Sequence, residues 1–178
     1  YTLPALNYHE GVPGHHLQIS TAQTAGDIPM LRKTAFMSAY SEGWALYAEQ
    51  LSDELKGYAT PLDRAGYLQS FLFRAARLVV DTGIHSKQWS REKATAYMVE
   101  KTGFTQARCQ REVERYCTQP GQATSYKVGH GVWTKARAAA QAAMGDRFDI
   151  KQFHAILEEG AMPLSMLEAR VAARAKMG

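Results

Sequence analysis

The sequence predicts an all-α protein of about six to eight helices without a substantial sheet. Apolar residues recur at helical spacing along most of the chain, and residues that cap helices precede these runs. No segment alternates apolar and polar residues as a half-buried strand does. Because the chain also lacks internal repeats, low-complexity tracts and linkers, we expect residues 1–178 to form a single α-helical domain.

Start and stop signals place the helices of the first half of the chain. A first helix is expected around the histidine-rich segment described below, and it ends before the turn at residues 26–29. Residues 31–55 carry the next apolar stripe, which closes at Gly57. Asp63 is expected to cap a long third helix that runs through Val79.

The second half of the chain is divided in the same way. Ser90, Thr105 and Asp149 are suitable N-terminal caps, and Pro163 is suited to the first turn of a last helix. A turn at residues 120–121 separates two of these elements. We therefore expect helices at about residues 90–103, 105–117, 123–144 and 149–160, and from residue 163 onward.

Composition favours a soluble globular protein. A chain of 178 residues with 46% hydrophobic content can bury one sizeable core. The formal charge of +4 is mild, and Arg108, Arg111 and Arg115 alternate with glutamates at helical spacing, which is typical of a solvated face. We therefore expect no nucleic-acid partner. No apolar run approaches the roughly 18 residues of a membrane span, so no transmembrane segment is expected.

The start of the chain indicates a piece of a longer protein. Its first residue is Tyr1 and not Met, and the histidine-rich segment begins only eight residues later. We therefore expect the chain to be the C-terminal part of a longer protein. The N-terminal portion of that protein is then an expected partner and would carry any targeting signal.

The chemistry-bearing residues concentrate in the segment HEGVPGHHLQ at residues 9–18. The usual zinc-peptidase motif places two histidines four residues apart on one helical face, with a glutamate between them as general base. Here the fourth position after His9 is Pro13, which cannot ligate and which removes a helical hydrogen bond. The next candidates for a second ligand are His15 and His16.

Helix geometry leaves both candidates open. At about 100° per residue, His15 lies about 240° around an ideal helix from His9. His16 returns to nearly the same face, but roughly 10 Å further along the axis. A metal shared by His9 and His15 therefore requires Pro13 and Gly14 to distort the helix, as a π-type bulge or a short break. A polar loop with surface histidines is the other interpretation.

A zinc site needs a third protein ligand, and the segment YSEGWALYAE offers two carboxylates. Glu42 and Glu49 are seven residues apart and so share a helical face. Glu42 follows the histidine pair by about 26 residues, which allows the first helix to end and the chain to return antiparallel. We expect Glu42 to be the ligand. Glu49 is expected either to support a ligand or to be a solvent-facing charge.

Five segments spread over nearly all of the chain resemble one family. They are HEGVPGHHLQ, YSEGWALYAEQL, RLVVDTGIHSKQW, ERYCTQPGQATSYKVG and FHAILEEGAMPLSMLEARV. Together they resemble the bacterial domain of unknown function 885, a family placed among the zincin-like metallopeptidases of the His-Glu type with a downstream Glu ligand. Its members are much longer, predominantly helical, and commonly secreted or lipid-anchored. The resemblance implies that this chain is the C-terminal catalytic portion of such a protein, with a secreted, periplasmic or lipid-anchored location.

The resemblance also implies a ligand set and a general base. His9, His15 and Glu42 would hold Zn²⁺, with His16 as the alternative to His15. Glu10 would take a proton from the metal-bound water, and the substrate would be a peptide.

An oxyanion donor is implied as well. Related helical metallopeptidases use a tyrosine or histidine from a late helix beside the developing oxyanion. Tyr126, in the segment SYKVG, matches that position best. His130 lies one helical turn beyond Tyr126 on the same face and is the second candidate.

Four further residues have two interpretations each. His85 is a candidate to line the cleft or to orient a metal ligand, with Asp81 as its carboxylate partner, and both residues are equally suited to capping or packing. Arg74 and Arg77 are candidates to bind a substrate carboxylate through a bidentate fork. The same arginines can instead pair with carboxylates of the Glu42 helix.

Three functional hypotheses follow from these residues. The favoured one is a zinc-dependent peptidase with Glu10 as general base. The alternative is a catalytically inactive or truncated helical scaffold, derived from such an enzyme, that still binds metal or peptide. A di-iron carboxylate bundle is disfavoured because the chain has no Glu-x-x-His pairs on two helices.

Overall fold

The computed structural model describes residues 1–177, and this part of the chain contains helices and no strand. The predicted all-α fold is therefore confirmed. Ten α-helices lie among the described residues: α1 (Leu3–Glu10), α2 (His15–Thr24), α3 (Met30–Thr34), α4 (Ser38–Glu54), α5 (Pro61–Lys87), α6 (Arg91–Thr102), α7 (Gln106–Thr118), α8 (Gln122–Met144), α9 (Ile150–His154) and α10 (Leu164–Met177). Short 3-10 helices at Gly145–Arg147 and Ala155–Glu159 flank α9.

Side-chain caps fix the starts of three helices, α5, α6 and α9. The Ser90 hydroxyl accepts a hydrogen bond from the Lys93 N–H at the start of α6, and the Asp149 carboxylate caps α9 in the same way. The prediction that Asp63 caps α5 is wrong by three residues. Thr60 is the cap, and Asp63 closes a capping box by accepting from the Thr60 backbone N–H.

The predicted helix at residues 31–55 is interrupted. The backbone carbonyl of Arg32 accepts a hydrogen bond from the Ala161 N–H at 2.8 Å, so a distant segment takes an acceptor that a continuous helix would use. Ala35 and Met37 are extended, and α4 begins only at Ser38. The first predicted helix divides as well, into α1 and α2, and these two divisions account for ten helices where eight segments are predicted.

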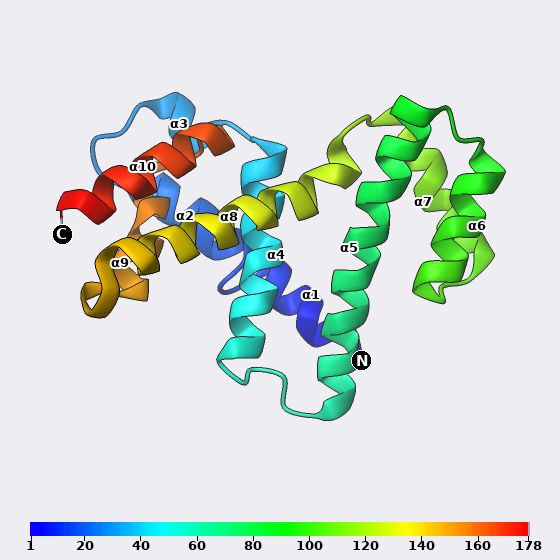
Figure 1. The fold of residues 1–178 in the computed structure, drawn as a ribbon, viewed down its shortest axis with the longest axis horizontal. Helices are drawn as coiled ribbons and strands as arrows, with labels where there is room; N and C mark the ends of the chain where they lie inside the picture. Colours follow the sequence, from blue (N-terminus) through cyan, green and yellow to red (C-terminus); the bar gives the residue numbers. More distant parts are fainter. Residues whose placement is uncertain (178) are drawn as a thin grey trace.

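Helices α4, α5 and α8 form the frame of the molecule. Figure 1 shows α4 and α5 antiparallel through the middle, with α8 crossing α4 and reaching α5, and α1 packed between α4 and α5. The pair α6 and α7 packs against α5 at one end, and α10 packs against α8 at the other. Within the described residues no helix combines the length and apolar character needed to cross a bilayer.

Two large apolar clusters stabilise the two ends of this frame. One gathers around the fully buried Trp44, Tyr47 and Trp133, where α4 and α8 meet the C-terminal helices. The other joins α5 to α6 and α7 and includes Val80 and Met98, which are also fully buried. The face of α4 that carries both candidate carboxylates lies within the frame: residues 40–49 are all buried.

Helices α4 and α8 cross at backbone contact. A Cβ atom built on Gly129 would lie 1.8 Å from the Ala39 carbonyl oxygen, and one built on Gly43 would lie 2.4 Å from the carbonyl carbon of Gly129. Only glycine fits at both positions, because any side chain would separate the helices. The crossing brings Tyr126, one turn before Gly129, towards Glu42, which precedes Gly43.

Replacing Gly129 by alanine is expected to lower the free energy of unfolding by at least about 2 kcal/mol, because the added methyl group overlaps the backbone of α4. Gly131, on the same helix, is the matched control, since no atom lies within 4 Å of a Cβ placed there. Gly131→Ala is expected to raise the free energy of unfolding by up to about 1 kcal/mol through helix propensity. Urea unfolding measures both variants, and equal midpoints would contradict the close crossing.

Candidate metal centre

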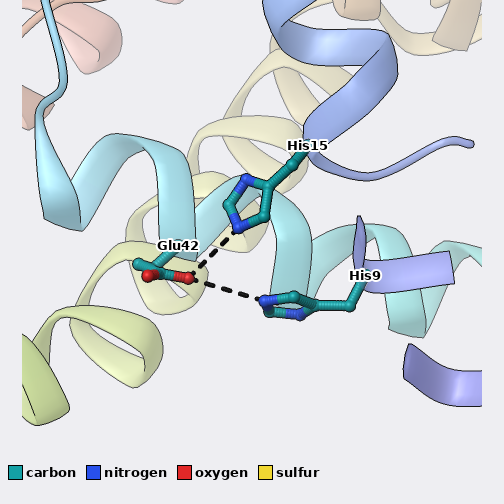
Figure 2. Close-up of side chains that lie close together, drawn as sticks. All are labelled: His9, His15 and Glu42. Carbon is teal, nitrogen blue, oxygen red and sulfur yellow. Dashed lines mark hydrogen bonds and ion pairs between the residues drawn. The ribbon is translucent and has the colours of Figure 1, made fainter. Parts of the chain in front are cut away.

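Three side chains from three helices converge at the centre of the frame. They are His9 at the end of α1, His15 at the start of α2, and Glu42 on α4. One ligand atom from each residue lies within 4.8 Å of the other two. Figure 2 shows both imidazoles pointing at one carboxylate oxygen, Glu42 Oε2, which is 3.5 Å from His9 Nε2 and 3.3 Å from His15 Nε2.

The helix break between α1 and α2 produces this convergence. Gly14 lies so close to α1 that a Cβ there would be 1.9 Å from the His9 carbonyl oxygen. The indole N–H of Trp44 donates to the Pro13 carbonyl at 2.9 Å and reaches the Gly14 carbonyl at 3.2 Å, which anchors the turn to α4. The His9 and His15 rings meet nearly perpendicular, with centroids 5.0 Å apart. The distortion is a short break, and it turns His15 back towards His9.

His16 does not join the cluster. Its side chain is solvent-exposed on α2, whereas its neighbour His15 is partly buried against Glu42. The alternative in which His16 replaces His15 therefore receives no support from the geometry.

The charge of Glu42 is held inside the protein by its neighbours. Burial alone would raise the pKa of this carboxyl, but hydrogen bonds from His15, His9 and Tyr126 outweigh burial and bring the pKa to about 2. Burial would likewise lower the pKa of His9, yet its hydrogen bonds with Glu42 and Glu49 raise it. An ionised carboxylate enclosed by two imidazoles is an environment that favours a bound cation.

Glu49 supports His9 from behind. Its carboxylate is fully buried, with Oε1 2.8 Å from His9 Nδ1, and it accepts a second hydrogen bond from the Ser70 hydroxyl at 2.7 Å. With Nδ1 donating to Glu49, His9 presents Nε2 to Glu42 as the free ligand atom. Metal-binding histidines are commonly oriented in this way by a carboxylate. Of the two expectations for Glu49, the solvent-facing charge is wrong.

The donor set fits a divalent metal. Two imidazole nitrogens and one carboxylate oxygen form the ligand set found in catalytic zinc sites that keep a position for water. His15 Nδ1 is buried without a hydrogen-bond partner among the described residues, whereas its Nε2 faces Glu42.

Tyr126 lies against the cluster, as its place in the sequence suggests. Its ring stacks on His9 with centroids 6.0 Å apart, and its hydroxyl accepts a hydrogen bond from the Gln122 amide at 3.1 Å. The same amide donates to Glu42 Oε1 at 3.2 Å. Burial and the nearby Glu42 charge raise the pKa of Tyr126, so the phenol keeps its proton and can donate at neutral pH.

Gln122 is a site residue that sequence reasoning missed. It precedes Tyr126 by four residues and so lies on the same face of α8, directly after the turn at residues 120–121. That spacing is the signal that could have identified it.

Glu10 and His130 lie outside the cluster. Glu10 follows His9 on the last turn of α1, and its side chain is exposed to solvent. His130 is buried, but its Nε2 pairs with Gln50 Oε1 at 2.6 Å and its ring packs edge-on against Phe71. Burial, with a smaller contribution from Lys127, lowers the pKa of His130 to about 4.

Asp81 caps the start of α8, and His85 is its neighbour on α5. The Asp81 carboxylate accepts hydrogen bonds from the backbone N–H groups of Gly121 and Thr124, at the start of α8. His85 Nε2 lies 3.4 Å from Asp81 Oδ1, as the predicted partnership requires, and 2.9 Å from the Tyr116 carbonyl oxygen. These contacts hold the first turns of α8, which carry Gln122 and Tyr126, without touching the ligands.

A family comparison covers almost the whole chain. The family model described as "Bacterial protein of unknown function (DUF885)" matches residues 1–171. No curated protein matches the sequence.

Two solved structures resemble the chain closely. One is described as "the putative lipoprotein from Colwellia psychrerythraea", with 44% sequence identity and a TM-score of 0.94 over 98% of this chain and 30% of that protein. The other is described as "a putative lipoprotein of unknown function from Shewanella oneidensis", with 27% identity and a TM-score of 0.86 over 96% of this chain and 31% of that protein. The chain thus spans about a third of the length of these two proteins.

Proposed function

The chain belongs to the bacterial family of unknown function DUF885, and we propose that it is the metal-binding, catalytic portion of a zinc-dependent peptidase of that family. The observation that carries the proposal is the convergence of His9, His15 and Glu42 around one point, with Glu49 oriented behind His9. A structural role alone does not explain why a helix is broken to turn two imidazoles onto one buried carboxylate.

Zinc at this position would acidify a water molecule and polarise a peptide carbonyl. The protein supplies the remaining functions. Glu10, beside His9, accepts a proton from the water and passes it to the leaving amine nitrogen. The water oxygen becomes bonded to the carbonyl carbon as the C–N bond breaks, so one water is consumed for each peptide bond.

Tyr126 is the residue we assign to stabilise the carbonyl oxygen as it gains negative charge. Its protonated hydroxyl lies beside Glu42, where Gln122 positions it. His130 is the less suitable candidate for this task, because Gln50 and Phe71 hold it away from the cluster.

A metal-binding scaffold without turnover is the second candidate function. The observation that favours it is the exposed Glu10 side chain, which forms no hydrogen bond or ion pair with His9, His15 or Glu42. For either function, the lipoprotein descriptions of the two similar structures support a lipid-anchored or secreted location for the whole protein.

The ligand assignment is tested by zinc titration of the purified chain. His15→Ala is expected to lower zinc affinity at least about 100-fold, since one of three protein ligands is lost. His16→Ala, one position away on the same helix, is the matched control and is expected to bind zinc as the parent does. Loss of affinity only with His16→Ala would overturn the assignment.

Glu49→Gln is expected to weaken zinc binding about 10- to 100-fold, because the amide cannot accept the His9 proton as a carboxylate does. Glu54→Gln removes a charge from the exposed end of the same helix and serves as the control. Circular dichroism verifies that both variants stay helical. Unchanged zinc affinity in Glu49→Gln would mean that His9 needs no such partner.

Peptide hydrolysis by the zinc-loaded chain separates the two candidate functions. Glu10→Gln is expected to retain one zinc per chain and to lose activity at least about 1000-fold, because the general base is removed. Glu100→Gln, an exposed glutamate on α6, is the activity control. Equal turnover by Glu10→Gln and the parent would remove Glu10 as base, and zinc binding without any turnover by the parent would favour the scaffold.

A further inference from the structure

A basic pocket lies between α1, α5 and α7, next to the candidate metal centre. It encloses about 230 Å³, which is smaller than the roughly 300–1,000 Å³ typical of pockets for drug-sized ligands and suits the end of a chain. Its walls include residues of all three helices, namely Thr2, Leu6, Arg74, Arg77, Arg108 and Glu112.

The pocket shares its walls with the metal centre. Thr2 and Leu6 precede Glu10 at intervals of four residues, so one face of α1 runs from the pocket to the proposed base. On the opposite side, the guanidinium groups of Arg74 and Arg77 lie over the Tyr126 ring, 5.6 and 4.9 Å from its centroid. The Tyr126 ring therefore lies between the arginines of the pocket and His9 of the candidate metal centre.

The positive charge of the pocket is only partly compensated. Arg77 is engaged, because it donates to the Tyr116 hydroxyl and to Glu112, both at 2.9 Å. Arg74 donates to the Ser70 hydroxyl at 2.5 Å and approaches Glu49 to 3.8 Å, but its buried Nε has no hydrogen-bond partner among the described residues. Arg108 stacks on a phenylalanine ring and forms no ion pair within residues 1–177. The Arg108 guanidinium thus remains available to a carboxylate, and the partly engaged Arg74 guanidinium lies beside it in the wall of the pocket.

Apolar surface completes the pocket. Leu6, Phe73 and Phe104 line it together with the arginines, and Arg108 lies 3.6 Å over the Phe104 ring. A carboxylate beside an apolar side chain is the chemistry of a peptide's C-terminal residue. Arginine is suited to such a group, because its planar fork matches the two carboxylate oxygens.

We propose that this pocket binds the free C-terminal carboxylate of a peptide, so that the chain removes residues from the C-terminal end of its substrate. The inference rests on the proposed peptidase function. Arg74 and Arg108 supply the donors, and Tyr126 separates the bound chain end from the metal position. The small volume then limits the cut to a bond near the end of the peptide.

The test measures binding, with turnover removed by Glu10→Gln in the zinc-loaded chain. The probe is a short apolar peptide labelled at its N-terminus, compared with the same peptide amidated at its C-terminus. Fluorescence anisotropy is expected to give at least about tenfold tighter binding of the free acid, since a guanidinium forms stronger hydrogen bonds with a charged carboxylate than with a neutral amide.

Two variants locate the carboxylate. Adding Arg108→Gln is expected to reduce the preference for the free acid to within about threefold, whereas Arg108→Lys retains part of it. Arg111→Gln removes the same charge from the exposed surface of the same helix and is expected to leave the preference intact. Arg74→Gln is expected to act as Arg108→Gln does, with zinc content measured alongside because Arg74 adjoins Glu49.

Three outcomes would overturn the inference. The first is equal affinity for the free acid and the amidated peptide. The second is a preference for the free acid that survives in both Arg108→Gln and Arg74→Gln. The third is an amidated peptide that ends in glutamate and binds as tightly as the free acid of the apolar peptide. The last outcome would assign the pocket to acidic side chains.

The two proposals can fail separately. If the chain binds zinc and hydrolyses peptides but has equal affinity for the free acid and the amide, only this inference fails. If the acid preference is found without hydrolysis, the pocket stands and the peptidase proposal fails.

Discussion

Two carboxylates on a buried helix are the constraint around which this structure is arranged. Residues 40–49 of α4 are all buried, and Glu42 and Glu49 lie on one face of that stretch. A carboxylate inside a protein costs several kcal/mol unless charged or hydrogen-bonding groups surround it. His9 contacts both carboxylates, with Nδ1 2.8 Å from Glu49 and Nε2 3.5 Å from Glu42. The helices that contribute His9, His15, Ser70 and Gln122 are therefore tied to α4 by polar contacts, as well as by apolar packing.

Backbone contacts make those polar contacts possible. Gly14 lets the chain turn directly over the last residues of α1, and Trp44 bonds that turn to α4. Gly43 and Gly129 let α8 approach α4 until the two backbones touch. Both contacts depend on the absence of a side chain, and both end at the same place, where the imidazoles and Tyr126 meet Glu42. Asp81 holds the start of α8 in register from the side of α5.

Much of the fold was predictable, because helix signals are local. The capping roles of Ser90 and Asp149 and the all-helical fold are confirmed. The continuous helix predicted at residues 31–55 was wrong for a non-local reason. The Arg32 carbonyl accepts a hydrogen bond from the N–H of Ala161, a residue far along the chain. The predicted cap of α5 was wrong for a local reason. Thr60 and Asp63 are both suitable capping residues, and Pro61 at the first helical position places the cap at Thr60.

The sequence by itself determined which residues are candidates for the metal centre. His9, Glu42 and the pair His15 and His16 stand out from their types and spacing, and Pro13 requires a break in the helix. Tyr126 was indicated by the resemblance to the family. The tertiary structure alone decided how that break is resolved, because the choice between His15 and His16 depends on the direction in which α2 leaves the turn. It also decided that Glu49 is buried behind His9, that Gln122 joins the site, and that Arg74 and Arg108 share a pocket. Spacing along one helix defines a face, but the neighbour of that face is chosen by packing between segments distant in sequence.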